Sequence, residues 1–371
     1  MAKESVVVFS VTNDLQTDQR VDKMCNLFVS QGFKVILVGR EKRNSKPLKK
    51  RNYQTNRFSL WVNNGPLFYL IYNFRLFLFL LSKKANILYA NDLDTLLANY
   101  LVSKIRKTPL VYDTHEYFTE VPELINRKTV QSAWVWIEKT IFPKLKHVIT
   151  VNQSIADVYR KKYGVDIAVV RNLPVKNENT GITKNIRVNG KKIVIYQGAI
   201  NVHRGIEYMV EAMQYLDDII LWIIGDGDIR QKIENQVEKL NLSDKIKMPG
   251  VIPFQELYQF TQQADLGLSL EEDKGLNYRY ALPNKLFDYI QAEIPVLVSP
   301  LIEMKNIIEK YKVGELLNDH NPRELANQIK GMLADQQKIL IWKANAKVAA
   351  KELCWENEQQ KVYALLKTIE F

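Results

Sequence analysis

The sequence predicts an α/β protein with two parallel-sheet domains. Short apolar runs alternate with helical segments along the chain, which is typical of βαβ units. The 371 residues exceed one ordinary hydrophobic core. A polar stretch at 171–187 interrupts the pattern, and a second series of the same kind follows it. We therefore expect one domain over residues 1–175 and another over 176–349.

The first series contains five short apolar runs that we interpret as strands and one early segment that we interpret as a helix. The helix is expected at Arg20–Gln31. The strands are expected at Val6–Val11, Val35–Val38, Ile87–Ala90, Leu110–Tyr112 and Val148–Val151. In parallel sheets of this kind ligands bind beyond the carboxyl ends of the strands. The chemistry should therefore lie in the loops that follow these runs.

The second series repeats the alternation with a longer set of segments. It contains strand Ile193–Tyr196, a helix at Ile206–Tyr215, the runs IILWII, KIKMPGVI and ADLGLSLE, and the segment LPNKLFDYIQAEIP followed by VLVS. The last helical stretch, 350–371, carries aromatic residues and is expected to pack back and complete the first domain.

The net charge of +11 is confined to the first half of the chain. Residues 1–175 hold 27 Lys and Arg against 14 Asp and Glu, whereas residues 176–371 hold 25 against 27. Seven basic residues and one acidic residue lie in Arg40–Arg51. This run is either a solvated loop or a contact for anionic lipid headgroups. No nucleic-acid-binding motif accompanies it, so we expect no nucleic-acid partner.

The stretch Leu67–Ser82 is strongly apolar but is interrupted by Asn73 and Arg75. It is short for a membrane span of about 20 residues. It is therefore either a helix of the first domain's core or a helix that lies in a membrane interface. No signal peptide opens the chain, and two distant cysteines suit a reducing compartment. We expect a cytoplasmic protein, with peripheral contact at the inner face of the cell membrane as one possibility.

The segment Leu282–Pro295 predicts a helix whose amino end binds phosphate. Pro283 suits a helix entry, Asn284 is a favourable cap and Pro295 ends the helix. The helix dipole and Lys285 favour an anion, and Asp288 one turn later suits the hydroxyls of a ribose. The alternative interpretation is an ordinary capped helix with a solvated carboxylate.

A second candidate for phosphate binding is the loop QGAINVHRG, which follows strand Ile193–Tyr196. Gly198 and Gly205 would let the backbone approach a ligand, and Arg204 offers a planar fork for phosphate oxygens. Alone, this is also the composition of a tight turn with a surface arginine. Both candidates, however, open at the carboxyl edge of one sheet.

In the first half, His115 and Glu116 directly follow a predicted strand in VYDTHEYFTE. A histidine there can donate to a sugar hydroxyl or serve a structural role. The first strand leads into TNDLQTDQR, which lacks the glycines of a dinucleotide-binding turn. The acidic pairs at 92/94 and 226/228 are interpreted as helix starts, and we assign no metal.

Together these segments resemble the retaining GT-B glycosyltransferases of the group 1 family. The likeness is carried by VYDTHEYFTE, VITVNQSIADVYRKKYG, YQGAINVHRGIEYMVEAM, IIGDGD and LPNKLFDYIQAEIPVLVS, in that order. It implies two Rossmann-like domains facing a central cleft, with a nucleotide-diphosphate-sugar held mainly by the second domain. It implies no cofactor besides that donor.

The resemblance also implies roles for individual positions. Catalytic roles fall on His115, Arg204 and Lys285. Donor binding falls on Gly198, Arg204, Gly205, Gly225, Val251, Asn284, Lys285, Leu286 and Asp288, and the acceptor side on Asn13, Asp14, Arg20 and Glu116. The chain departs from the family at Ala199, where an arginine is usual, and at Tyr280, where a carboxylate is usual.

The implied function is sugar transfer, with retention, to a hydroxyl of a glycan, which the basic first domain suggests is lipid-linked, as in bacterial surface polysaccharides. Two alternatives keep the fold. A nucleotide-sugar epimerase would consume its donor without an acceptor, and a non-catalytic subunit would bind the donor without transfer or hydrolysis. A two-domain dehydrogenase is disfavoured because the dinucleotide-binding glycines are absent.

Overall fold

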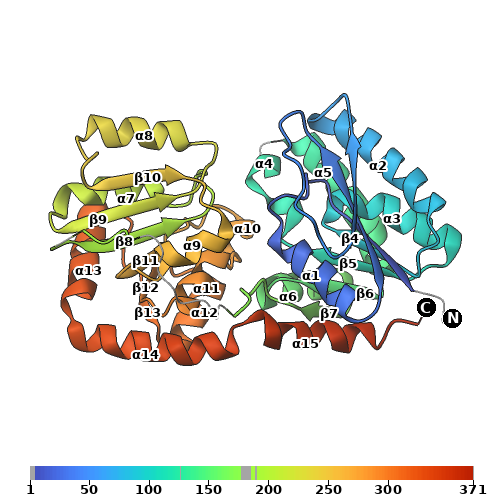
Figure 1. Ribbon diagram of the computed structural model, residues 1–371. Helices are drawn as coiled ribbons and strands as arrows, with labels where there is room; N and C mark the ends of the chain where they lie inside the picture. The colour runs from blue at the N-terminus through green and yellow to red at the C-terminus, as the bar shows by residue number, and fades with distance from the viewer. Residues whose placement is uncertain (1–4, 126, 177–184, 189, 371) are drawn as a thin grey trace. The chain divides into compact units, whose positions relative to one another are not determined.

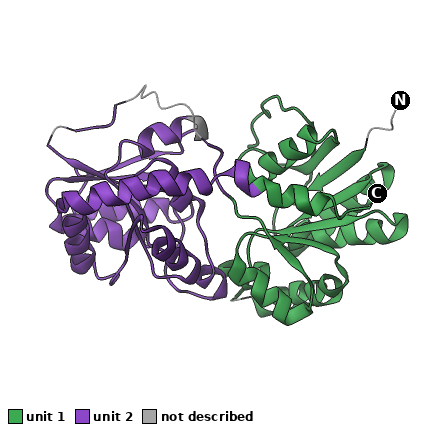
Figure 2. Ribbon diagram, turned by 90° about the horizontal axis from the view of Figure 1, so that it is seen from below, with its two compact units in different colours: residues 1–172, 359–371 green, residues 173–358 purple. Residues whose placement is uncertain are grey.

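The computed structural model describes residues 5–125, 127–176, 185–188 and 190–370. Its contacts divide the chain into two compact units, residues 1–172 with 359–371 and residues 173–358 (Figure 2). The last helix, α15 (Trp355–Leu366), begins in the second unit and ends in the first. The middle of the predicted linker, 177–184, lies outside the described residues.

The first unit is built on a seven-stranded parallel sheet of order β3-β2-β1-β4-β5-β6-β7 (Figure 1). Its order reverses between β1 and β4, because Val7 pairs with Val35 of β2 on one side and with Ile87 of β4 on the other. Ligands in such sheets bind beyond the strand ends at this reversal. The strands are β1 (Val6–Ser10), β2 (Lys34–Glu41), β3 (Gln54–Ser59), β4 (Ile87–Asn91), β5 (Leu110–Thr114), β6 (His147–Thr150) and β7 (Ile167–Val169).

Helices cover this sheet, and their ends follow local signals in the sequence. The first begins where the Asp18 side chain accepts from the Val21 N–H at 3.1 Å. α6 begins in the same way at Asn152 and ends at Gly164 in the left-handed region. The helices are α1 (Gln19–Ser30), α2 (Gly65–Ser82), α3 (Leu93–Arg106), α4 (Pro122–Ile125), α5 (Lys128–Ile141) and α6 (Gln153–Tyr163), with short 3-10 turns at Phe118–Glu120 and Phe142–Lys144.

The second unit contains a six-stranded parallel sheet of order β10-β9-β8-β11-β12-β13, which reverses between β8 and β11. The strands are β8 (Lys192–Gln197), β9 (Ile219–Ile224), β10 (Ile246–Gly250), β11 (Leu266–Ser269), β12 (Val296–Val298) and β13 (Gly314–Leu316). The helices are α7 (Ile206–Ala212), α8 (Arg230–Lys239), α9 (Phe254–Thr261), α10 (Leu276–Arg279), α11 (Asn284–Gln291), α12 (Ile302–Tyr311), α13 (Pro322–Ala334) and α14 (Gln336–Glu352), with a 3-10 turn at Met213–Tyr215.

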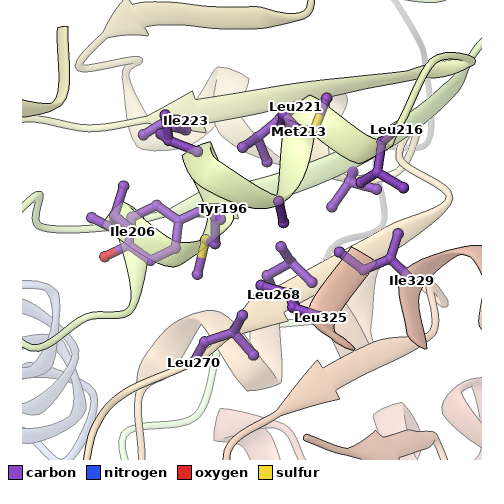
Figure 3. Close-up of a cluster of buried hydrophobic side chains, with 14 of the residues drawn as sticks. Tyr196, Ile206, Met213, Leu216, Leu221, Ile223, Leu268, Leu270, Leu325 and Ile329 are labelled. Atoms are coloured by element: carbon purple, nitrogen blue, oxygen red, sulfur yellow. The ribbon is translucent and has the colours of Figure 1, made fainter. Parts of the chain in front are cut away.

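Two buried clusters sandwich this second sheet. Figure 3 shows the first, in which Leu221 and Leu268 of the sheet meet Met213 beyond α7 and Leu325 of α13. The second joins the other face of the sheet to α11, α12 and α14. The strands are apolar on both faces because both are covered, as expected for a parallel sheet. This rigid sandwich fixes the loops at its carboxyl edge.

Candidate functional site

Three residues of the second unit approach one another closely at the end of β8. A side chain at Gly225 would lie 1.9 Å from the carbonyl oxygen of Gly198, and one at Gly198 would lie 3.3 Å from Cε of Lys285. Both glycines have positive φ angles, 134° for Gly198 and 144° for Gly225. Glycine is thus required here by sterics, and the loop brings bare backbone to the lysine.

Lys285 and Arg204 converge on a buried carboxylate, Glu271. Nζ of Lys285 lies 2.7 Å from Glu271 Oε1, and a guanidinium nitrogen of Arg204 lies 3.5 Å from the same oxygen. Ser269 Oγ donates to Oε2 at 2.8 Å. Lys285 also lies 4.2 Å from the centroid of the Tyr196 ring. The predicted anion groups of the helix and of the loop after β8 therefore meet at one place.

Burial governs the charges in this cluster. The Glu271 side chain is fully buried, whereas that of Arg204 is 28% exposed. Burial alone would raise the pKa of Glu271, but Lys285 and Arg204 outweigh it and hold that pKa below its usual value. Burial lowers the pKa of Lys285, which Glu271 only partly opposes. Among the described residues, Nε of Arg204 is buried without a hydrogen-bond partner.

The loop that carries Arg204 is locked by the segment after β11. A side chain at Gly205 would lie 2.2 Å from the Leu270 carbonyl oxygen, and the φ angle there is 74°. The Glu272 N–H donates to the His203 carbonyl at 3.0 Å. The Tyr278 hydroxyl donates to the Val202 carbonyl at 3.0 Å, and its ring centroid lies 5.3 Å from the Arg204 guanidinium carbon. Arg204 is therefore held on a rigid support.

Helix α11 departs in two details from the prediction. Asn284 is not its cap. Pro283 precedes the helix with extended backbone, and exposed Asn284 is the first helical residue. Leu286 is fully buried in the core and its N–H donates to the Pro283 carbonyl at 3.2 Å. Neither its side chain nor its amide is offered to a donor substrate. The earlier amides, which have no partner within a helix, remain at the tip beside Lys285.

The remaining donor-binding candidates lie along the same edge of the sheet. Asp288 accepts from the Gln197 side chain at 2.9 Å. The Gly225 N–H donates to the Gly250 carbonyl at 3.0 Å, which joins the ends of β9 and β10. Val251 follows directly and is 70% exposed. Asp288 and Gly225 therefore lie beside the loop of Gly198.

In the first unit, His115 forms the centre of a polar cluster at the ends of β4 and β5. The backbone N–H of His115 donates to Asp92 Oδ1 at 2.8 Å, and the ring Nδ1 of His115 lies 3.3 Å from Asp92 Oδ2. Its Nε2 lies 3.8 Å from an oxygen of Asp113 and has no hydrogen-bond partner among the described residues. Burial lowers the pKa of His115, but Asp92 and Asp113 outweigh this effect and raise it to about 9. The ring is thus an oriented imidazolium at neutral pH.

Arg20 does not reach towards an acceptor, contrary to the prediction. It is buried, donates to both oxygens of Asp113 at 3.1 and 2.7 Å, and donates to the Val170 carbonyl at 2.8 Å. Its guanidinium is used in holding Asp113 beneath His115. Although burial alone would raise the pKa of Asp113, Arg20 and His115 lower it well below its usual range.

The other acceptor-side candidates lie in loops at the same edge. The Asn13 side chain donates to Asp18 at 2.8 Å and accepts from the Leu15 N–H at 2.9 Å. Asp14 accepts from the Ser45 hydroxyl at 3.1 Å. These two side chains shape the loop after β1. Glu116 is half-buried next to His115, and its carbonyl accepts from Thr114 at 2.8 Å.

Two residues that the structure makes prominent were only weakly indicated by the sequence pattern. Glu271 was one of three neighbouring acids, and only its burial distinguishes it from Glu272 and exposed Asp273. Asp92 was interpreted as a helix start. It precedes α3, but its side chain makes no capping bond and its φ and ψ of 57° and 167° lie in a region that favours glycine. A polar residue held in such a conformation is typical of a functional site.

Fold and sites together define a GT-B protein, with one Rossmann-like parallel-sheet unit of seven strands and one of six. The "Glycosyl transferases group 1" model matches residues 178–349, and the "Glycosyltransferase Family 4" model matches residues 18–173. The two matches together span most of the chain: its second part matches the group 1 glycosyltransferase family and its first part matches glycosyltransferase family 4.

Individual relatives are distant in sequence. An alpha-D-kanosaminyltransferase of Streptomyces kanamyceticus is 23% identical over an alignment of 256 positions, which covers 64% of this chain and 64% of that protein. Among solved structures, HepE of Anabaena in complex with UDP and glucose superposes with a TM-score of 0.77 at 15% identity, covering 99% of this chain and 100% of the other. WaaG, a glycosyltransferase involved in lipopolysaccharide biosynthesis, gives 0.73 at 14% identity, covering 97% and 98%. The solved structures establish the fold.

Proposed function

We propose that the protein transfers a sugar from a nucleotide-diphosphate-sugar to a hydroxyl of a glycan acceptor, with retention of anomeric configuration. The observation that carries this proposal is the convergence of Arg204 and Lys285 on Glu271 beside the glycine loop after β8. Two cations, bare backbone and a helix amino end suit a diphosphate. The UDP complex of the similarly folded HepE supports the same ligand class.

The proposed chemistry stabilises the leaving diphosphate. The bond from the anomeric carbon to the diphosphate oxygen breaks, and a bond to the acceptor oxygen forms on the same face of the sugar. The acceptor's proton passes to the leaving phosphate. Arg204, Lys285 and the first amides of α11 stabilise the negative charge that develops. Asp288 accepts from the ribose, and the backbone of the segment that contains Val251 would contact the base.

His115 is proposed, from its position in the family pattern, to donate to a hydroxyl of the transferred sugar. Its ring is held by Asp92 and its pKa is raised to about 9, so it is charged at neutral pH. An imidazolium can donate a charge-assisted hydrogen bond, about twice as strong as a neutral one.

The acceptor is proposed to be a lipid-linked glycan at the cytoplasmic face of the cell membrane, in the synthesis of a bacterial surface polysaccharide. The excess of basic residues lies in residues 1–175, and the similarly folded WaaG is involved in lipopolysaccharide biosynthesis. Attraction to anionic lipid is worth about 1 kcal/mol per basic residue near the surface.

A panel of nucleotide-diphosphate-sugars tests the proposal without knowledge of the acceptor. The correct donor should raise the unfolding temperature of the full chain and be hydrolysed slowly, and Arg204→Ala should weaken both effects. Conversion of the donor into an epimer would instead indicate an epimerase. Binding without any hydrolysis or transfer, across candidate acceptors, would indicate a non-catalytic subunit and contradict the proposal.

A further inference from the structure

Helix α2 presents an apolar face that no other described part of the chain covers. Phe68, Tyr72, Leu76 and Leu80 are buried, at one-turn intervals, against the rest of the first unit. The opposite face exposes large apolar side chains: Leu67 is 47% exposed, Leu70 68%, Phe74 61% and Leu78 49%. A helix that is apolar on all sides is normally buried on all sides. Half of that burial is missing here.

The exposed residues form a continuous stripe. At about 100° per residue, Leu67, Leu70, Phe74 and Leu78 fall within an arc of about 80°. Trp61, which is 81% exposed, lies just before the helix. By length and composition α2 could cross a membrane, with 18 residues, but only 22% of it is buried in the structure. The expectation of a core helix is therefore correct only for one face.

Basic residues frame the end of this stripe. Lys83 and Lys84 follow α2, and the Arg106 guanidinium at the end of α3 donates to the Lys83 carbonyl at 3.1 Å. The two helices therefore end side by side, and they also lie next to each other in Figure 1. Leu101 and Ile105 of α3 are 44% and 63% exposed. The sequence holds no Asp or Glu between positions 65 and 91 or between 95 and 112.

We propose that the exposed face of α2, with the end of α3, docks on the surface of an anionic lipid bilayer. An apolar stripe with a cationic border and no acidic residue complements an acyl layer beneath anionic headgroups. Exposed Trp61 suits the headgroup level, where tryptophan is enriched. Leu70 and Phe74 occupy the middle of the stripe, and we expect them to insert most deeply.

The helix lies in the interface and does not span the bilayer. The Asn73 side chain donates to the Asp94 carbonyl at 2.8 Å, and the Tyr72 hydroxyl donates to the Val11 carbonyl. These bonds and the four buried side chains fix α2 to the sheet. Arg75 adds a charge at mid-helix, where its guanidinium donates to the Ser59 carbonyl at 2.6 Å.

The same bonds connect the docking face to the functional edge of the first unit. Val11 directly follows β1 and Asp94 lies just after β4, the two strands at which the sheet order reverses. A membrane-bound α2 would hold this edge, with His115, next to the headgroups. An acceptor whose lipid stays in the bilayer could then present its sugar hydroxyl there. This consequence, unlike the lipid binding itself, rests on the proposed function.

Vesicle co-sedimentation of the full chain tests the inference. Wild type should bind vesicles of phosphatidylcholine with phosphatidylglycerol at low salt and bind phosphatidylcholine alone much more weakly. Leu70→Asp with Phe74→Asp should reduce the partition coefficient at least about tenfold. The matched control is Leu340→Asp with Ile341→Asp on α14, where the side chains are 69% and 58% exposed. This control should bind like wild type.

A charge variant tests the cationic border separately. Lys83→Gln with Lys84→Gln should weaken binding to the anionic vesicles about fivefold for each charge removed. Binding to phosphatidylcholine alone should not change. An equal loss on both kinds of vesicle would mean that these lysines do not face anionic headgroups and would contradict the charge argument.

Three results would overturn the inference. The first is no binding of wild type to anionic vesicles at low salt, and the second is an equal loss of vesicle binding in the α2 and α14 variants. The third is that wild type binds no lipid but is a dimer in light scattering, whereas the α2 variant is a monomer. The last would assign the stripe to a second copy of the chain. Stabilisation by the nucleotide-sugar, retained in the α2 variant, shows that it is folded. Binding to anionic vesicles, together with no thermal stabilisation by any nucleotide-sugar and no hydrolysis of one, would refute the proposed function but not the docking surface.

Discussion

Replacing Lys285 by methionine separates the structural role of this lysine from its proposed catalytic role. The change replaces the lysine by an unbranched apolar side chain one atom shorter and leaves Glu271, which is fully buried, without its partner at 2.7 Å. Breaking a buried ion pair in this way costs about 3–5 kcal/mol. Arg204 remains at 3.5 Å from the same oxygen, so we expect a loss near the lower limit, about 3 kcal/mol. At about 2–4 °C per kcal/mol, the unfolding temperature should fall by about 6–12 °C.

Turnover should fall as well, because one of the two cations on the leaving diphosphate is lost. A charge-assisted contact is worth about 1.5–3 kcal/mol, which corresponds to a loss of about 10-fold to 100-fold. The assay is donor hydrolysis or transfer at a temperature at which the variant is folded, alongside chemical unfolding of both proteins.

The double variant Lys285→Met with Glu271→Leu tests the reasoning. Removing both charges should restore stability to within about 1 kcal/mol of wild type, because well-packed apolar residues can replace a buried ion pair. Turnover should stay low, since no second cation is present. Recovery of turnover together with stability would show that Lys285 acts only structurally. A single variant as stable as wild type would refute the coupling between Lys285 and Glu271.

Three further predictions address the other charged positions. Arg204→Ala should lower turnover about 10-fold to 100-fold, whereas Arg323→Ala, a surface control on α13, should leave it unchanged; near-normal transfer by the first variant would refute its assignment. Asp92→Asn should lower the pKa of His115 from about 9 towards 6.5 in an NMR titration. The contribution of that raised pKa to stability is complete below pH 6.5 and is lost as pH rises through 9. The variant should therefore lose this pH dependence of its free energy of unfolding. An unchanged His115 titration would exclude the Asp92 contact. Burial, followed by repulsion from Asp92, raises the pKa of Asp94 from 3.8 to about 7. Because the folded protein binds this proton more tightly than the unfolded chain, the free energy of unfolding should fall as the pH rises from about 4 to about 7. Asp94→Asn should flatten that fall in chemical unfolding.

Burial determined which strands could be predicted from the sequence. The five predicted runs of the first unit correspond to β1, β2, β4, β5 and β6, whose central residues are buried on both faces. β3 (Gln54–Ser59) was not predicted, because only Phe58 of its six residues is buried and the rest are polar. It lies at the edge of the sheet. An edge strand needs only backbone pairing on one side, so it leaves little hydrophobic pattern in the sequence.

The candidate site was predictable where backbone geometry required a residue type. Gly198 was found because strand ends carry the chemistry of a parallel sheet, and Gly225 was found through the family resemblance. The structure shows that a side chain at Gly225 would collide with the Gly198 carbonyl at 1.9 Å. The function of Glu271 could not be predicted in this way. Its role depends on the distance to Lys285, fourteen residues later, and on complete burial, and both are tertiary properties.

Glu271 also explains how two cations can lie close together at a donor site. A buried lysine without a counter-charge would lose its proton, since desolvation disfavours the charged form. Glu271 neutralises one of the two positive charges, so that Lys285 and Arg204 with Glu271 carry a net charge of about +1. A diphosphate meets an attractive but partly compensated site, because the carboxylate still repels it. We infer that this compensation weakens product binding as well as donor binding. Glu271→Gln should therefore bind the nucleoside diphosphate product more tightly and release it more slowly, which stopped-flow displacement can measure. Weaker binding of the nucleoside diphosphate by this variant would show that Glu271 orients Lys285 and does not weaken binding by compensating its charge.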